Sequence, residues 1–190
     1  MTTTLTNEIK AHEVLVFGLL AALLLMPGAA HFINTGALSQ YFTYHVLDGQ
    51  FLYVLSKFLG LYAFVLFWLQ LLGGSYRSPL TGVGGSQSHR GLGALVLVLI
   101  LLHAGLFVTG VSIRNQHFAY QWLLPDLFTT YYPRIVSLGL IALVLLLVSI
   151  GMAVWRARRG NAWRMGHWLV WVAFGLAFVH SYTIGSEAKL

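Results

Sequence analysis

The chain has 190 residues, of which 58% are hydrophobic and 8% are charged, with a net charge of +6. A soluble domain carries roughly 25% charged residues, so this composition predicts an integral membrane protein in contact with lipid. The sequence contains no cysteine, which excludes disulfides, thiolate metal sites, iron–sulfur clusters and thiol catalysis. No basic tract interleaved with aromatic residues is present, so we expect no nucleic acid partner.

Several apolar stretches approach the roughly 20 residues that a membrane-spanning helix requires. They are Glu13–Ala30, Phe51–Leu72, Gly91–Val111, Ile135–Trp155 and His167–Ile184. We therefore predict an all-α membrane bundle of about five transmembrane helices with short interfacial helices, forming a single domain over residues 1–190. The connections 31–50 and 112–134 are rich in aromatic residues, as is typical of the membrane interface.

The distribution of basic residues predicts the orientation of the chain. The inner segments would carry Lys10, Arg77, Arg90, Arg156, Arg158, Arg159 and Arg164, and the outer ones Arg114, Arg134 and Lys189. Because basic residues accumulate on the cytoplasmic side, we expect a cytoplasmic N-terminus and an outer C-terminus, in the inner (plasma) membrane of the cell. Lys57 lies within the second helix, where it either snorkels to the interface or meets a buried anion.

Two apolar stretches are each associated with a pair of histidines, His89 and His103 with one and His167 and His180 with the other. The interval from His167 to His180 is one residue shorter than that from His89 to His103. Ionisable side chains inside a membrane are costly and therefore functional candidates. The third and fifth helices run in the same direction, and a rise of about 1.5 Å per residue gives separations of about 21 and 20 Å. Each histidine therefore has a partner at matching depth. Imidazole suits iron, so one bis-histidine haem at each depth would account for all of them.

The two spacings differ in rotation about the helix axis. At about 100° per residue, the spacing from His89 to His103 returns the side chain to within roughly 40° of its starting face, whereas that from His167 to His180 leaves it roughly 140° away. We therefore expect the fifth helix to twist, to bulge or to meet its two haems from different sides, and a π-bulge near Gly175 is one way to achieve this. The competing interpretation is that these histidines are buried polar residues bonded to neighbouring helices. Zinc is disfavoured because no carboxylate or thiol lies at either depth.

The histidine-bearing segments resemble the ferric reductase-like transmembrane domain superfamily. The matching residues are His89-Arg90-Gly91-Leu92-Gly93 through Leu102-His103, and Trp163-Arg164-Met165-Gly166-His167 through Val179-His180. This superfamily includes ferric reductases, NADPH oxidases and the membrane haem subunit of the methionine sulfoxide reductase system, and the resemblance covers residues 51–185. It implies two haems b that carry electrons singly across the bilayer, held by His89 and His167 on the inner side and by His103 and His180 on the outer side.

One part that members of this superfamily usually contain, a flavin-binding module, does not occur in this sequence. Ferric reductases and NADPH oxidases usually continue into a cytoplasmic module that binds FAD and NAD(P)H, but here only residues 185–190 follow the fifth apolar stretch. No glycine motif of the phosphate-cradling type follows a strand. We therefore expect electrons to come from a separate flavin reductase, from a flavin bound near the inner face, or from membrane quinol or quinone.

Cationic side chains flank both histidine depths. Arg77, Arg90 and Arg164 at the inner end would pair with haem propionates or attract an acidic partner, or they are ordinary positive-inside residues. Lys57 and Arg114 are weaker candidates at the outer end. His31 and His45 fall in the first outer connection, where exposed histidines are usually ordinary polar residues.

The favoured function is transmembrane electron transfer by an oxidoreductase, or by the haem subunit of a two-component system, from a cytoplasmic-side donor to an outer acceptor. Bis-histidine ligation leaves no open position on iron, so a ferric chelate, oxygen or a protein would be reduced by outer-sphere transfer. Two alternatives stay open. One is a quinol-linked dihaem cytochrome b acting on oxygen species, and the other is a non-redox transporter with a histidine proton or metal path.

Overall fold

The computed structural model describes residues 2–37, 39–43, 45–75, 86–155 and 162–185, and it is helical with no strand in these ranges. The elements are α1 (Thr2–Thr35), α2 (Gln40–Thr43), α3 (Gln50–Ser75), α4 (Ser86–Asn115), the 3-10 helix η1 (Tyr120–Leu123), α5 (Tyr131–Val154), α7 (Ala162–His167) and α8 (Leu169–Ile184). Five helical segments are long and apolar enough to cross a membrane. The predicted all-α architecture with five candidate spans is therefore confirmed.

The helices extend beyond the apolar windows that predicted them. α4 begins at Ser86 and ends at Asn115, and α1 continues to Thr35. Backbone hydrogen bonds propagate a helix residue by residue whatever the polarity of its side chains, so hydropathy marks only the apolar middle. The prediction that His31 lies in an outer loop is wrong, because this residue is part of α1. Its side chain is fully buried, with its ring centre 5.1 Å from that of Phe58 on α3.

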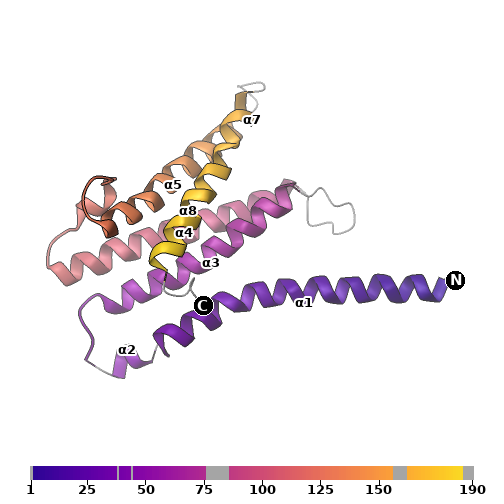
Figure 1. Ribbon diagram of the computed structural model, residues 1–190, viewed down its shortest axis with the longest axis horizontal. Coiled ribbons are helices and arrows are strands. Elements are labelled where there is room, and N and C mark those ends of the chain that lie inside the picture. The colour runs from indigo at the N-terminus through magenta and orange to yellow at the C-terminus, as the bar shows by residue number, and fades with distance from the viewer. Residues whose placement is uncertain (1, 38, 44, 76–85, 156–161, 186–190) are drawn as a thin grey trace.

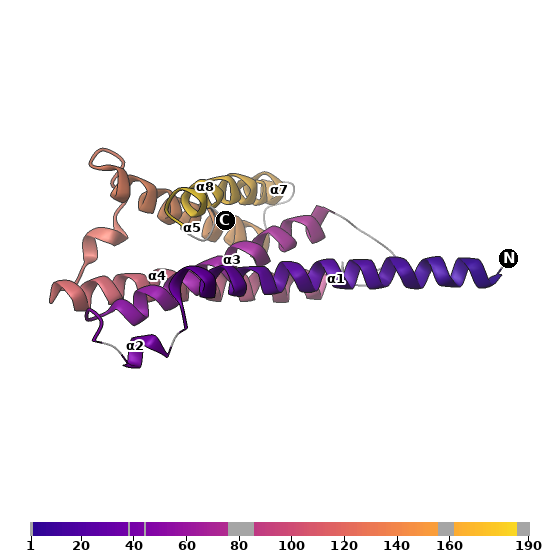
Figure 2. The same ribbon diagram turned by 60° about the horizontal axis from the view of Figure 1, so that its bottom comes forward.

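Two helix pairs form the centre of the molecule (Figures 1 and 2). One pair is α3 with α4. The other is α5 with α7 and α8, which together form the fifth candidate span. The pairs meet where α8 contacts α3, and α1 packs against α3. The N-terminal part of α1 projects beyond the other helices in both views. The histidine-bearing helices α4 and α8 thus belong to different pairs.

A hydrophobic core lies between the two histidine depths. Its buried members are Phe67, Leu71, Val96, Leu146 and Ala173. Val96 stands midway between His89 and His103 in the sequence of α4. The ring of Phe174 on α8 stacks on Phe64 of α3 at 5.3 Å between centres. Close packing of these apolar side chains joins the two helix pairs and leaves the histidines above and below the core.

The fifth span is interrupted immediately after His167. The backbone N–H of Trp168 reaches the carbonyls of both Arg164 and Met165, and Trp171 N–H donates to Trp168 O at 3.0 Å. That last bond closes a turn of the 3-10 type, which rises about 2.0 Å per residue instead of about 1.5 Å. The tight turn therefore lets the shorter spacing from His167 to His180 cover nearly the same rise as the longer spacing on α4. The π-bulge predicted near Gly175 is wrong, because α8 is continuous α-helix from Leu169 to Ile184.

The connection between η1 and α5 is fastened to α5 by side-chain hydrogen bonds. Ser137 on α5 accepts a hydrogen bond from the Asp126 backbone N–H at 2.7 Å. The Thr129 hydroxyl donates to the Asp126 carboxylate, and this bond lowers the pKa of the Asp126 carboxyl below its ordinary value. The loop therefore holds η1 against α4 and α5.

Candidate functional site

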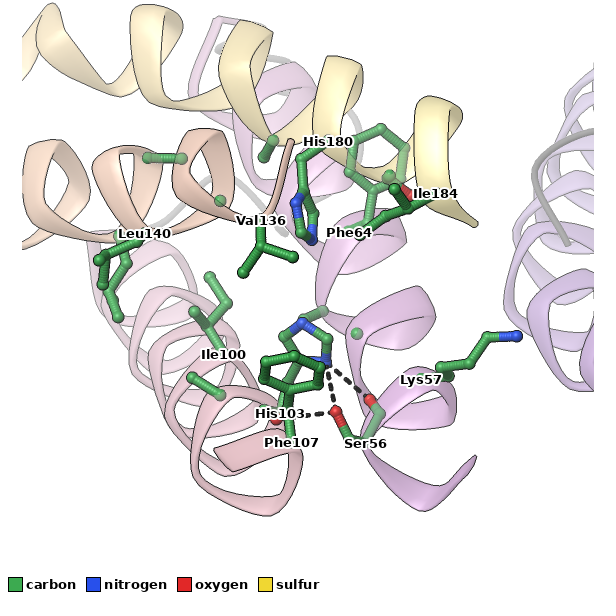
Figure 3. Close-up of a pocket in the computed structure, with 18 of the residues that line it drawn as sticks. Ser56, Lys57, Phe64, Ile100, His103, Phe107, Val136, Leu140, His180 and Ile184 are labelled. Carbon is green, nitrogen blue, oxygen red and sulfur yellow. Dashed lines mark hydrogen bonds between the residues drawn. The ribbon is translucent and has the colours of Figure 1, made fainter. Parts of the chain in front are cut away.

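We name the two histidine pairs outer and inner after the predicted orientation, and the outer pair consists of His103 on α4 and His180 on α8. Their ring centres are 6.4 Å apart and their planes are inclined by 76°. Both side chains are partly buried and line a cavity of about 230 Å³ between the two helix pairs. Figure 3 shows the two rings facing each other across this cavity.

Hydrogen bonds fix the orientation of the outer rings. Nδ1 of His103 lies 2.8 Å from the backbone carbonyl of Ser56, and Nδ1 of His180 lies 2.9 Å from that of Ile135. A carbonyl oxygen can only accept, so Nδ1 is the protonated nitrogen in both rings. Each ring consequently keeps the lone pair of Nε2 for a ligand in the cavity, which is the arrangement that metal-binding histidines use.

Two glycines let the neighbouring helices approach the outer rings. A Cβ atom added to Gly60 on α3 would lie 2.8 Å from Nδ1 of His103, and one added to Gly139 on α5 would lie 2.9 Å from Nδ1 and Cε1 of His180. Such distances are shorter than real Cβ contacts. Any larger residue at these positions would displace the imidazole from the carbonyl that orients it.

The inner pair consists of His89 on α4 and His167 at the end of α7. Their ring centres are 6.3 Å apart, again with planes inclined by 76°. The buried Ser149 hydroxyl donates to the carbonyl of His167 at 3.2 Å and lies 3.1 Å from Nδ1 of the same residue. The hydroxyl has one proton, so while it donates to the carbonyl its oxygen can only accept from Nδ1–H. In that arrangement His167 also keeps the lone pair of Nε2.

His89 differs from the other three histidines. Gln70 on α3 donates its amide N–H to the His89 carbonyl at 2.7 Å, and the same amide nitrogen lies 3.4 Å from His89 Nε2. The ring is thus turned towards α3 as well as towards His167. Its orientation is set by a side-chain amide, whereas the outer rings are oriented by backbone carbonyls.

Both separations fit one metal ion between two imidazoles. A metal–imidazole bond is about 2.0 Å long, and ring bonds of about 1.33 Å place the ring centre about 1.1 Å from each nitrogen. Two rings on opposite sides of one ion therefore have centres roughly 6 Å apart. The observed 6.3 and 6.4 Å match this value. Each depth brings two imidazoles together, and within the described ranges no group of three or more His, Cys, Asp or Glu side chains is positioned to hold a metal.

The residues that orient the histidines were not singled out from the sequence. They occupy matching positions on α3 and α5, and the same interval in the sequence separates the members of every matching pair. The matching positions are Ser56 and Ile135, Gly60 and Gly139, and Gln70 and Ser149. The paired histidines follow nearly the same interval, His89 with His167 and His103 with His180. Aligning the sequence of α3 with that of α5 at this constant interval would have identified these positions.

The predicted cationic residues have different surroundings. Arg90 and Arg164 are exposed beside the inner histidines, and the Arg164 guanidinium lies 5.9 Å from the centre of the Trp163 ring. Arg77 lies outside the described residues. Lys57 borders the outer cavity, but its side chain points away from the two histidine rings (Figure 3). His45 is exposed in the connection before α3, as predicted.

No family model, curated protein or solved structure matches this chain.

Proposed function

We propose that this chain is a membrane electron-transfer protein that holds two haems b, one between His103 and His180 and the other between His89 and His167. The observation that carries the proposal is the pair of imidazole separations, 6.4 and 6.3 Å, each of which suits an iron with two axial nitrogens. The resemblance of these segments to ferric reductase-like domains supports the same assignment.

The bound haems would supply reversible one-electron chemistry at two depths of the bilayer. The chain's own residues tune each depth differently. The carbonyls of Ser56 and Ile135 accept from the outer imidazoles, which raises the basicity of these ligands. At the inner depth the Ser149 hydroxyl contacts Nδ1 of His167, whereas the Gln70 amide nitrogen beside Nε2 of His89 can only donate. The outer cavity is lined mainly by apolar side chains and therefore excludes water from the imidazoles.

The direction of transfer follows from the two ends of the bundle. Exposed Arg90 and Arg164 beside the inner histidines form a cationic entrance that would attract an acidic flavoprotein. We propose that a flavin reductase or a membrane quinol donates electrons there, and that an acceptor outside receives them at the outer end. Because each haem iron would be held by two histidines, an acceptor would receive its electron by outer-sphere transfer.

The proposal is tested by quantifying haem in the purified protein. Pyridine haemochrome spectra are expected to give two b haems per chain in the wild type and about one in His103→Ala. His117→Ala is the matched control, because His117 is exposed on the outer connection and its Nδ1 lies 2.9 Å from the nearby Asn115 carbonyl. It should retain both haems. A colourless wild-type protein with full helical content would overturn the proposal.

The serine contacts predict an asymmetry between the two depths. Ser149→Ala removes the acceptor of His167 Nδ1–H, and loss of such an orienting partner typically lowers metal affinity about 10- to 100-fold. Ser56→Ala leaves the backbone carbonyl in place for His103, so the outer haem should be retained with little change. Haem titration of the two variants measures the difference. Equal effects of both substitutions would show that these serines do not orient the rings.

A further inference from the structure

A cluster of hydrogen-bond donors surrounds the outer mouth of the cavity that contains His103 and His180. Tyr53 on α3, Trp122 on η1 and Tyr132 on α5 line this cavity. Three separate elements thus place polar side chains beside the outer histidines. None of these residues takes part in the imidazole contacts described above, so they have no role in the proposed ligation.

Trp122 carries the clearest sign of a missing ligand. Its indole Nε1 is buried and has no hydrogen-bond partner among the described residues. The ring is fixed by edge-on contacts with Phe107 at 5.6 Å and with Tyr132 at 5.7 Å between centres. A buried N–H without an acceptor is destabilising, and the indole group can only donate. The site therefore requires an acceptor that the described part of the protein does not itself provide.

The groups beside Trp122 favour an anionic acceptor. The Tyr132 hydroxyl is hydrogen-bonded to that of Tyr53 and lies within the field of Arg114. The Arg114 guanidinium stands 6.0 Å from the centre of the Tyr53 ring and donates to the neutral amide of Gln50. One hydroxyl proton is used between the two tyrosines, so the guanidinium, the remaining hydroxyl proton and the indole N–H form the donor set that a carboxylate would satisfy.

We infer that Arg114, Trp122 and the Tyr53–Tyr132 pair bind a carboxylate of the haem held between His103 and His180. This inference rests on the proposed function and adds the residues that fix the rotation of the outer haem. Because these side chains hold the carboxylates at the outer mouth, every acceptor meets the same haem edge. Access to that edge then depends on η1 and on the loop that Ser137 fastens.

The test compares haem b with its dimethyl ester, whose carboxylates are blocked. Both are titrated into apoprotein of the His167→Ala variant, which retains only the outer pair. We expect the ester to bind about tenfold more weakly or worse, since it loses charge-assisted hydrogen bonds. Adding Trp122→Phe or Arg114→Gln should bring the two dissociation constants close together. Trp171→Phe, on an exposed part of α8, is the control and should leave the discrimination unchanged.

The outcomes separate this inference from the proposed function. Equal binding of haem b and its ester by the His167→Ala protein would overturn the carboxylate site and leave bis-histidine ligation intact. The same conclusion follows if Trp122→Phe and Arg114→Gln discriminate as strongly as their parent. Failure of the His167→Ala protein to bind either form would overturn the outer haem site and this inference with it.

Discussion

Combining His103→Ala with His180→Ala is expected to leave one haem b per chain, the same content as either single substitution. The reason is that these two rings face each other at 6.4 Å and would serve one iron. Combining His103→Ala with His167→Ala is expected to leave none, because those residues belong to different pairs. Pyridine haemochrome content per chain measures both results.

This comparison tests the pairing and not only the importance of each histidine. Every double variant removes two imidazoles, so a general loss of stability would affect both combinations alike. Circular dichroism and size-exclusion chromatography in detergent show whether each variant is folded. If the His103→Ala/His180→Ala protein lost both haems while remaining folded, or if the cross-level variant kept one, the arrangement of ligands proposed above would be wrong.

Gly60→Val is expected to abolish binding of the outer haem while sparing the inner one. Already the first side-chain carbon would lie 2.8 Å from Nδ1 of His103, and the branched residue adds two methyl groups. Overpacking of this kind typically costs about 1–3 kcal/mol, and here the imidazole must also leave the Ser56 carbonyl. The haem content should fall from two to about one, with a lower midpoint in thermal unfolding. Gly139→Val should act in the same way through His180.

Gly105→Val provides a matched control for this effect. Gly105 lies on α4 only two positions after His103, but a Cβ atom there would meet nothing within 4 Å. Valine has the same intrinsic helix preference in both places, so any difference between the variants reports contact with the imidazole. Retention of both haems in Gly60→Val would show that α3 does not need to approach the ring so closely.

The helices and the paired histidines could be predicted from the sequence for clear physical reasons. A span requires a long apolar stretch, and a histidine within such a stretch stands out against it. The spacing between His89 and His103 also predicted that the two would share a helix face. These signals depend on composition along one helix, and they were sufficient to predict the all-α architecture.

Contacts between helices could not be predicted in this way. Nothing in the local sequence of α3 shows that Ser56 lies against His103, because that contact joins residues 47 positions apart. The structure has a tight turn at Trp168, whereas a bulge was expected near Gly175. Helix periodicity shows that the fifth helix must depart from regular α-helical geometry, but it does not show at which residue. His31 was assigned to a loop because the apolar stretch ends before it, although α1 continues and Phe58 contacts its ring.

The constant interval between matching positions of α3 and α5 has an evolutionary consequence. A hairpin of two helices, copied in tandem within one gene, would produce this order and register. In a homodimer of such hairpins, each copy would contribute one imidazole to each depth. In a single chain the two halves can differ, as Gln70 differs from Ser149 at the matching inner position. In a homodimer every substitution occurs in both subunits. In a single chain, one substitution can change one half of the site and leave the other half as it was.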